Sequence, residues 1–184
     1  MNIPVIIDNF ITADDCDHLI NTYKENVQKS RTVNSTTGLM EVHPSRTSST
    51  FFLPDKDSVV RCLKEKVSEY LNVPYTHIEG LQLLQYQKGE KYLYHHDYFS
   101  GENVKNQRVH TIIVYLNDLD VSDGGATSFF HHSLKVQPKK GAAVHFRNMD
   151  ESNVLIGTSL HSGEEILTSV IKYAINIWTR QYPL

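Results

Sequence analysis

The second half of the sequence consists of short strand-like runs separated by turn residues, and this pattern constrains the fold more than any other feature. From Glu79 onward, Gly, Asn, Asp or Pro interrupts the chain after every few apolar or β-branched residues, with no helical periodicity between the interruptions. Many short strands at this spacing are typical of an antiparallel sandwich or jelly roll. The predicted strands are Leu81–Tyr86, Tyr92–His96, His110–Leu116, Thr127–Phe130, Leu134–Gln137, Ala142–Phe146 and Lys172–Trp178.

The first part of the chain predicts one strand followed by two helices. A β-branched run at Ile3–Phe10 predicts the strand, and Thr12–Asp15 has the spacing of a capping box at a helix start. Apolar residues at steps of three and four continue this helix to about Lys29. A second helix begins at Asp57 and stops before Pro74. We therefore expect a mainly β (α+β) fold, a double-stranded β-helix (jelly roll) with the N-terminal helices packed on one sheet.

No internal repeat, low-complexity tract or linker divides the sequence, so we expect residues 1–184 to form a single domain. Residues 1–78 would supply helical support and a loop, and residues 79–184 the jelly-roll core. The loop is Ser30–Thr50, whose Ser, Thr, Asn, Gly and Pro content is typical of a surface segment rather than a core element. Loops of this length often act as lids, so this segment is either a lid over a ligand or an ordinary mobile loop.

The composition argues against several kinds of partner. The 18 basic and 21 acidic side chains give 18 − 21 = −3 with histidines neutral, which is too near balance for a dedicated nucleic-acid or membrane-surface protein. The sequence shows no export signal and no apolar run of the ~20 residues that a membrane span needs, which predicts a cytoplasmic protein. Cys16 and Cys62 lie at apolar-periodic helix positions and are expected to be reduced and buried. No feature of the sequence specifies an oligomeric state.

Histidine is unusually frequent, with ten residues, and two of the ten have an acidic residue two positions later. Residues two apart on a strand point to the same side, so His95 with Asp97 and His77 with Glu79 are both candidate pairs of metal ligands. Spacing alone does not choose between the pairs. Apart from His161, we assign no chemical role to the other histidines, which are His18, His43, His96, His110, His131, His132 and His145.

The sequence around His95 belongs to a longer ordered set of motifs. From Tyr86 the chain reads Y-x-x-G-x-x-Y-x-x-H-x-D, and R-x-x-T-x-x-x-Y-L-N-D follows from Arg108. G-G-x-T-x-F then begins at Gly124, S-L-H-S-G at Ser159 and K-Y-A-I-N-I-W thirteen residues later. In this order the motifs resemble the prolyl 4-hydroxylase branch of the 2-oxoglutarate- and iron(II)-dependent dioxygenases. The resemblance extends over nearly the whole chain and favours the His95 pair.

This resemblance implies an iron-dependent enzyme whose metal ligands are His95, Asp97 and His161. Two histidines and one carboxylate on one face of iron(II) leave coordination positions open for other ligands. By resemblance, the cofactors would be Fe(II), 2-oxoglutarate and O2, with ascorbate as reductant. The reaction would hydroxylate peptidyl proline, as in procollagen-proline 4-dioxygenases, and convert 2-oxoglutarate to succinate.

A carboxylate of 2-oxoglutarate buried in a barrel is costly unless a cation and hydrogen-bond donors meet it. The resemblance implies that Lys172 is this cation, with Tyr86 and Thr127 as hydrogen-bond donors. Lys172 lies 172 − 161 = 11 residues after His161, one more than the family usually has, and the glycine that commonly precedes it is absent. We expect a one-residue bulge to absorb the difference.

Substrate contacts are implied at Tyr92, Arg108, Trp178 and Arg180, which correspond to the peptide groove of the family. Aromatic rings can stack on a proline ring, and guanidinium groups can hold peptide carbonyls. Tyr92 and Trp178 are equally consistent with aromatic residues of the core or its rim.

Alternatives remain beside the predicted hydroxylation of a proline-containing peptide or protein. One is a dioxygenase that acts on another residue or on a small molecule, because one fold hosts many reactions. Another is a catalytically silent jelly-roll binding module. A nucleic-acid demethylase is disfavoured, because the sequence lacks clustered Lys and Arg.

Overall fold

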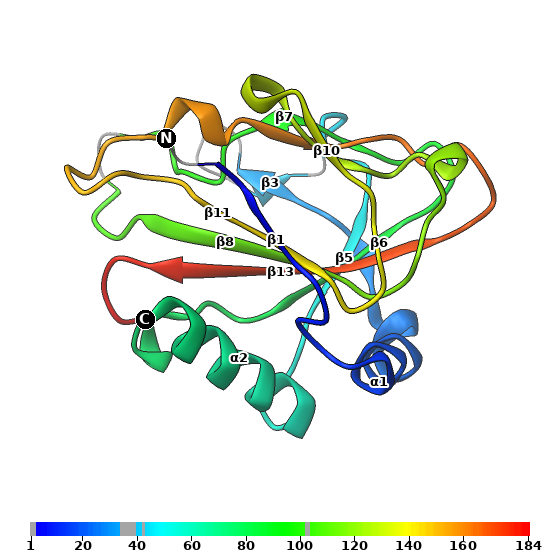
Figure 1. Ribbon diagram of the computed structural model, residues 1–184, viewed down its shortest axis with the longest axis horizontal. Helices are drawn as coiled ribbons and strands as arrows, with labels where there is room; N and C mark the ends of the chain where they lie inside the picture. The colour runs from blue at the N-terminus through cyan, green and yellow to red at the C-terminus, as the bar shows by residue number, and fades with distance from the viewer. Residues whose placement is uncertain (1–2, 34–39, 42, 102–103) are drawn as a thin grey trace.

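A computed structural model describes residues 3–33, 40–41, 43–101 and 104–184 (Figure 1). The helices are α1 (Ala13–Tyr23) and α2 (Ser58–Leu71). The strands are β1 (Val5–Ile7), β2 (Gln28–Lys29), β3 (Thr32–Val33), β4 (Met40–Glu41), β5 (Ser49–Phe52), β6 (Gln82–Tyr86), β7 (Tyr92–His95), β8 (Arg108–Tyr115), β9 (Thr127–Phe129), β10 (Leu134–Val136), β11 (Ala143–Arg147), β12 (His161–Gly163) and β13 (Lys172–Arg180).

The strands form two main sheets and one small pair. The larger sheet has seven strands in the order β1-β11-β8-β13-β6-β5-β2, and the smaller has four in the order β10-β9-β12-β7. Strands β3 and β4 pair separately. All pairings within the two main sheets are antiparallel.

The central strands of the large sheet bury both faces, because successive side chains enter two different apolar layers. On β8, Ile112 and Val114 pack in the layer that contains the helices, whereas Ile113 and Tyr115 pack in the layer shared with the small sheet. All four side chains are at most 7% exposed. A strand covered on both faces reads as a continuous apolar run, as Ile112–Tyr115 of β8 does.

Both helices lie on one face of the large sheet (Figure 1). Leu19 of α1 and Val60 of α2 are fully buried there. Each helix begins at a predicted cap: the side chain of Thr12 accepts a hydrogen bond from a backbone amide of α1, and Asp57 does the same for α2. The small sheet packs against the opposite face through residues that include Phe129. This arrangement confirms the predicted fold class, a jelly roll with N-terminal helices on one sheet.

All seven strands predicted for the second half of the chain are present, as β6 to β11 and β13. The prediction lacks β12, because His-Ser-Gly has neither apolar alternation nor β-branched residues. Pairing with β9 on one side and β7 on the other defines this strand, and such long-range contacts leave no local sequence signal.

The prediction of a long surface loop at Ser30–Thr50 is wrong for the described part of the segment. Strands β3 and β4 and the start of β5 fall within it, whereas residues 34–39 and 42 lie outside the described residues. Ser30, Arg46 and Ser48 are buried. The hydroxyl groups of Ser30 and Ser48 hydrogen-bond at 2.9 Å, and Ser30 N donates to Ser48 O. Polar residues that satisfy one another can be buried, although their composition is typical of a loop.

Two details of the helices also differ from the sequence prediction. Helix α1 ends at Tyr23 rather than near Lys29, because Lys24–Asn26 form a 3-10 turn and the next residues pair with β5. Cys16 is buried as expected, but Cys62 is exposed, because it lies outside the buried face of α2. In the described ranges, no helix is both long and apolar enough to cross a bilayer.

Candidate active site

The three predicted metal ligands converge at one end of the small sheet. His95 ends β7, Asp97 follows two residues later, and His161 begins β12 directly opposite His95. The carboxylate oxygens of Asp97 lie 3.6 Å from His95 Nε2 and 3.7 Å from His161 Nε2. Within the described ranges, this is the single group of three or more His, Cys, Asp or Glu residues whose ligand atoms all lie within 4.8 Å of one another.

Backbone hydrogen bonds orient both histidine rings. His95 Nδ1 donates to Leu93 O at 2.7 Å, and His161 Nδ1 donates to Ser159 O at 2.9 Å. A carbonyl oxygen can only accept, so each Nδ1 carries the ring hydrogen and each Nε2 keeps its lone pair. Both rings are therefore in the tautomer that a metal ion requires at Nε2.

A chain of buried hydrogen bonds positions the carboxylate of Asp97. Thr111 Oγ1 donates to Asp97 Oδ2 at 2.8 Å, and Asn148 Nδ2 donates to Thr111 Oγ1 at 2.8 Å. All three residues are buried. Thr111 belongs to one of the sequence motifs but has no predicted role, and no sequence pattern points to Asn148. Only the fold brings Thr111 and Asn148 together, because 37 positions separate them in the sequence.

Burial and mutual contact set the charges of these ligands. Burial, reinforced by His95, lowers the pKa of His161 to about 4. Burial acts to raise the pKa of Asp97, but contacts with His161 and His95 hold it well below its usual range. At neutral pH the site therefore presents a neutral imidazole at His161 and an ionised carboxylate at Asp97, the states in which these groups bind metals.

The chemistry of the donor set fits iron(II). Two imidazole nitrogens and one carboxylate oxygen are the donors of the facial triad in non-haem iron(II) oxygenases. The second nitrogen of each histidine and the second oxygen of Asp97 are held by protein hydrogen bonds, as is usual for metal ligands. The three residues could thus hold the ion without further rearrangement of their hydrogen bonds.

A small cavity of about 30 Å³ lies beside the triad. His95 and His161 line it together with Lys172, Tyr86 and Thr127, so the three predicted cosubstrate residues share one space with the two histidines of the triad. Lys172 and Tyr86 are direct partners across β13 and β6. Tyr115 donates from its hydroxyl to Thr127 Oγ1 at 2.8 Å, which fixes the Thr127 side chain.

Lys172 is a buried cation that forms no close ion pair with a carboxylate of the described residues, although Glu164 acts on it from a longer distance. Its Nζ donates to Gly125 O at 2.6 Å and lies 5.3 Å from the centre of the Tyr86 ring. Burial lowers the pKa of Lys172 to about 8. A buried ammonium of this kind is stabilised when an anion enters its cavity.

The longer spacing between His161 and Lys172 does not disturb β13. Its first five residues pair with β6 in continuous register, so the expected bulge is not found there. The segment 164–171 between β12 and β13 contains no strand, so it can change length without reversing the faces of β13. Lys172 therefore points into the cavity despite the spacing.

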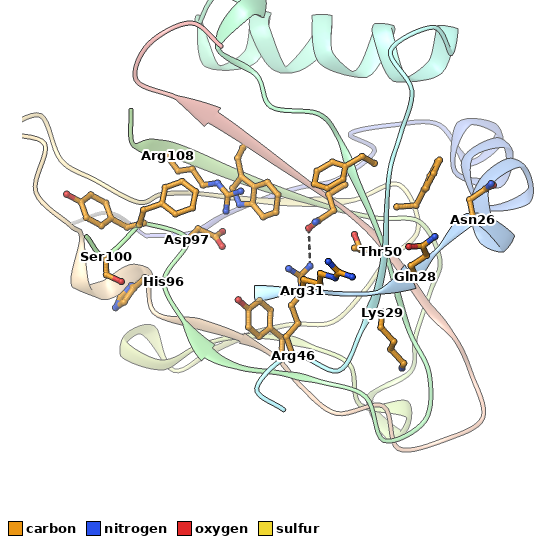
Figure 2. A pocket seen from close by; sticks show the side chains of 17 residues that line it. Asn26, Gln28, Lys29, Arg31, Arg46, Thr50, His96, Asp97, Ser100 and Arg108 are labelled. Atoms are coloured by element: carbon orange, nitrogen blue, oxygen red, sulfur yellow. Dashed lines mark hydrogen bonds between the residues drawn. The ribbon is translucent and has the colours of Figure 1, made fainter. Parts of the chain in front are cut away.

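A groove of about 790 Å³ opens on the other side of the triad (Figure 2). Asp97 lines it together with Tyr92, Arg108 and Trp178, three of the four predicted substrate contacts. Arg180 does not line the groove. The ring of Tyr92 stacks on His95 with 3.5 Å between ring centroids and lines both the groove and the cavity.

Glu79 explains the positions of both arginines. It accepts hydrogen bonds from Arg108 Nε at 2.7 Å and Nη2 at 2.9 Å, and it also pairs with Arg180 Nε. Glu79 therefore anchors two cations, and its neighbour His77 hydrogen-bonds through Nδ1 to Arg180 O. This excludes the alternative metal pair at His77 and Glu79. The Arg108 guanidinium lies 3.6 Å above the Trp178 ring, which fixes both groups in the groove wall.

Comparisons with known proteins agree with this geometry. Residues 81–180 match the family model described as the 2OG-Fe(II) oxygenase superfamily. The chain is 38% identical over 182 residues to prolyl 4-hydroxylase 5 of Arabidopsis thaliana, a match that covers 86% of this chain and 62% of the plant protein. Prolyl 4-hydroxylase 1 of the same plant is 30% identical, with 96% and 68% covered. The chain thus spans about three-fifths of the length of the first of these relatives.

A solved structure of a prolyl hydroxylase is also similar to this chain. The viral collagen prolyl hydroxylase vCPH from Paramecium Bursaria Chlorella virus-1, in its 2OG complex, superposes with a TM-score of 0.79 at 27% identity. The match covers 97% of this chain and 96% of the viral chain. The chain therefore belongs to the 2OG-Fe(II) oxygenase superfamily and, within it, to the prolyl 4-hydroxylase family.

Proposed function

We propose that this chain is an Fe(II)- and 2-oxoglutarate-dependent dioxygenase that hydroxylates peptidyl proline. One observation carries the proposal: the triad lies at the boundary between two spaces of different character. His95 and His161 face the cavity that contains the Lys172 ammonium, whereas Asp97 faces the aromatic groove. Such a site can take a small dianion on one side and a peptide on the other.

Each residue has a definite task in this proposal. His95, Asp97 and His161 would hold iron(II), and Lys172 with Tyr86 and Thr127 would receive the distal carboxylate of 2-oxoglutarate. With O2, the bound iron and 2-oxoglutarate supply the oxidation, in which one oxygen atom enters the substrate C–H bond and the other enters succinate, with release of CO2. We propose ascorbate as the reductant that keeps the iron ferrous.

The groove supports a peptide rather than a small metabolite as the substrate. It is open, and its wall beside Asp97 is formed by the rings of Tyr92 and Trp178. Arg108 is held rigidly by Glu79 and by its contact with Trp178. Its position and charge suit a peptide carbonyl, and preorganised groups of this kind lose little entropy when a ligand binds.

The decisive experiment is a panel of proline-containing peptides incubated with iron(II), 2-oxoglutarate, ascorbate and O2. We expect succinate formation coupled to a mass gain of one oxygen atom on proline. If succinate formation were instead coupled to oxidation of another residue or of a small molecule, that residue or molecule would be the substrate and proline would not. Absence of both an iron-dependent absorption band and any 2-oxoglutarate turnover would identify a silent binding module instead.

We also propose a cytoplasmic location. The support is that Cys16 and Cys62 are both free thiols, as is usual in reducing compartments. Fractionation of cells that express the native protein, followed by thiol labelling, tests this location. Recovery of the protein in a secreted or organellar fraction would contradict it.

A further inference from the structure

We infer that the middle of the groove, next to the predicted metal ligands, binds anionic side chains, so that the preferred peptide carries Asp or Glu beside the reacting proline. The inference rests on the proposed function and names the substrate class for the same site. It depends on the distribution of charge along the groove.

The groove is strongly cationic although the protein as a whole is anionic. Among the described residues, its lining contains four basic side chains, Lys29, Arg31, Arg46 and Arg108, and one carboxylate, that of the predicted metal ligand Asp97. The whole chain has a formal charge of −3. The positive potential is therefore a local property of this groove, and a concave surface focuses such a potential on its ligand.

Two of the four cations already have carboxylate partners. Arg108 is paired with Glu79, and Lys29 with Glu90. Arg46 and Arg31 pair with no carboxylate in the part of the chain that the structure describes. These two guanidinium groups are the ones that an incoming anion would neutralise.

Arg46 is the more constrained of the two. It is 7% exposed, its Nη2 donates to Gln82 Oε1 at 3.0 Å, and its guanidinium lies 5.0 Å from the centre of the Tyr92 ring. All of these partners are neutral, so they satisfy hydrogen bonds without compensating the charge. A buried cation in this condition gains more from an anionic ligand than an exposed one does.

The positions along the groove place these cations beside the reaction centre. Figure 2 shows Asp97 and Arg108 towards one end, Arg46 and Arg31 in the middle, and Gln28 with Lys29 towards the other end. An extended peptide with its proline at the triad would therefore lay its neighbouring residues over Arg46 and Arg31. A side chain carboxylate there can meet a guanidinium in bidentate geometry.

Matched peptides test this inference. Each set contains three peptides that share one proline and carry Glu, Gln or Lys at the flanking positions. In one set these positions lie before the proline, and in the other set they lie after it. On at least one side we expect the Glu peptide to have about 3- to 10-fold higher kcat/KM than the Gln peptide at low salt, mainly through KM. The Lys peptide should be poorer than the Gln peptide, and the differences should shrink as salt screens the charges.

Arg31→Gln should reduce the ratio between the Glu and Gln peptides towards one, whereas Arg31→Lys should retain part of it. Arg61→Gln removes an exposed arginine from α2, which does not line the groove, and should leave the ratio at its wild-type value. Equal kcat/KM for Glu and Gln peptides, or a ratio that Arg31→Gln does not change, would overturn the inference.

Binding measurements separate this result from the proposed function. Fluorescence anisotropy of labelled versions of the same peptides reports affinity in the presence of Mn(II), 2-oxoglutarate and no O2. If no peptide is hydroxylated but the Glu peptide still binds several-fold more tightly in an Arg31-dependent way, the anion site stands and the hydroxylation proposal fails. If the Gln peptide is hydroxylated as efficiently as the Glu peptide, hydroxylation stands and the anion site fails.

Discussion

His161 on β12 lies directly opposite His95 on β7, and the Nε2 atoms of both rings approach the carboxylate of Asp97 that follows β7. Register between two short strands thus brings together residues that are 161 − 95 = 66 positions apart. No other described His, Cys, Asp or Glu belongs to this group, so none could replace a lost ligand and each of the three is individually necessary.

We therefore expect His161→Ala to abolish the visible charge-transfer band that wild type gives on anaerobic addition of iron(II) and 2-oxoglutarate. Removing one of three protein ligands leaves too few donors to hold the ion in a fixed geometry. Absorption spectroscopy measures the band, and circular dichroism checks the fold. His131→Ala changes an exposed histidine on a turn and should keep the band. A band that survives in His161→Ala would show that the triad is wrongly assigned.

Thr111→Val should weaken metal binding about 10- to 100-fold without removing any ligand. The valine keeps the shape of threonine but cannot donate to Asp97 Oδ2, so the carboxylate loses one of the bonds that orient it. Isothermal titration calorimetry with Mn(II) measures the metal affinity. Thr76→Val, at an exposed position in a 3-10 turn, is the matched control. Equal Mn(II) affinity in Thr111→Val and wild type would limit Thr111 to a packing role.

Lys172→Met should remove cosubstrate binding and change the pH dependence of stability. The pKa of Lys172 is about 8 in the folded protein and 10.5 when unperturbed, so the unfolded chain binds more protons between these values. Burying the charged Lys172 lowers the free energy of unfolding by about 3 kcal/mol below pH 8, because the pKa shifts from 10.5 to about 8. This destabilisation disappears as the pH rises towards 10.5. Wild type should therefore gain stability over this window, and Lys172→Met should not.

Urea denaturation between pH 7 and pH 10 measures this difference, and thermal melts with Mn(II) and 2-oxoglutarate measure binding. We expect 2-oxoglutarate to raise the Tm of wild type but not that of Lys172→Met. Lys88→Met, at an exposed site, should behave as wild type in both assays. If 2-oxoglutarate raised the Tm of Lys172→Met as much as that of wild type, another residue would have to bind the cosubstrate carboxylate.

The strands could be predicted from sequence where their pattern is local. β8 and β13 contain several apolar or β-branched residues each, and the cap at Asp57 fixes the start of α2. The metal-ligand candidates were predictable because the motif around His95 is embedded in a longer ordered set. Lys172 could be proposed by the same route.

Other features depend on long-range contacts that no local pattern encodes. Strand β12 is formed by its two neighbours rather than by its own three residues. Arg46 is buried because Gln82 and Ser48 accept its hydrogen bonds, so a loop-like composition conceals part of a groove wall. Glu79 resembled a metal ligand by spacing, yet it serves Arg108 and Arg180, which are distant in sequence. Polar side chains that pair across the fold therefore could not be predicted from the sequence.

A pair of histidines outside the triad should make the protein sensitive to acid. His110 Nδ1 and His145 Nε2 hydrogen-bond at 3.0 Å on neighbouring strands of the large sheet, and Tyr70 of α2 contacts His145 edge-on. Burial lowers the pKa of both histidines to about 4, helped at His110 by its partner and at both by Arg147. Each ring is therefore neutral in the folded protein at pH values where the unfolded chain is protonated.

The unfolded chain binds more protons than the folded one between about pH 4 and 6.5, so the contribution of each histidine is complete above pH 6.5 and is lost as pH falls towards 4. His145→Gln removes one of these titrating groups, and it should lose about 2 kcal/mol less stability than wild type between pH 7 and 4.5. Urea denaturation at the two pH values measures this loss. His131→Gln, at an exposed turn, should lose as much as wild type. If His145→Gln and wild type lost equal stability, the acid sensitivity would have to come from other groups.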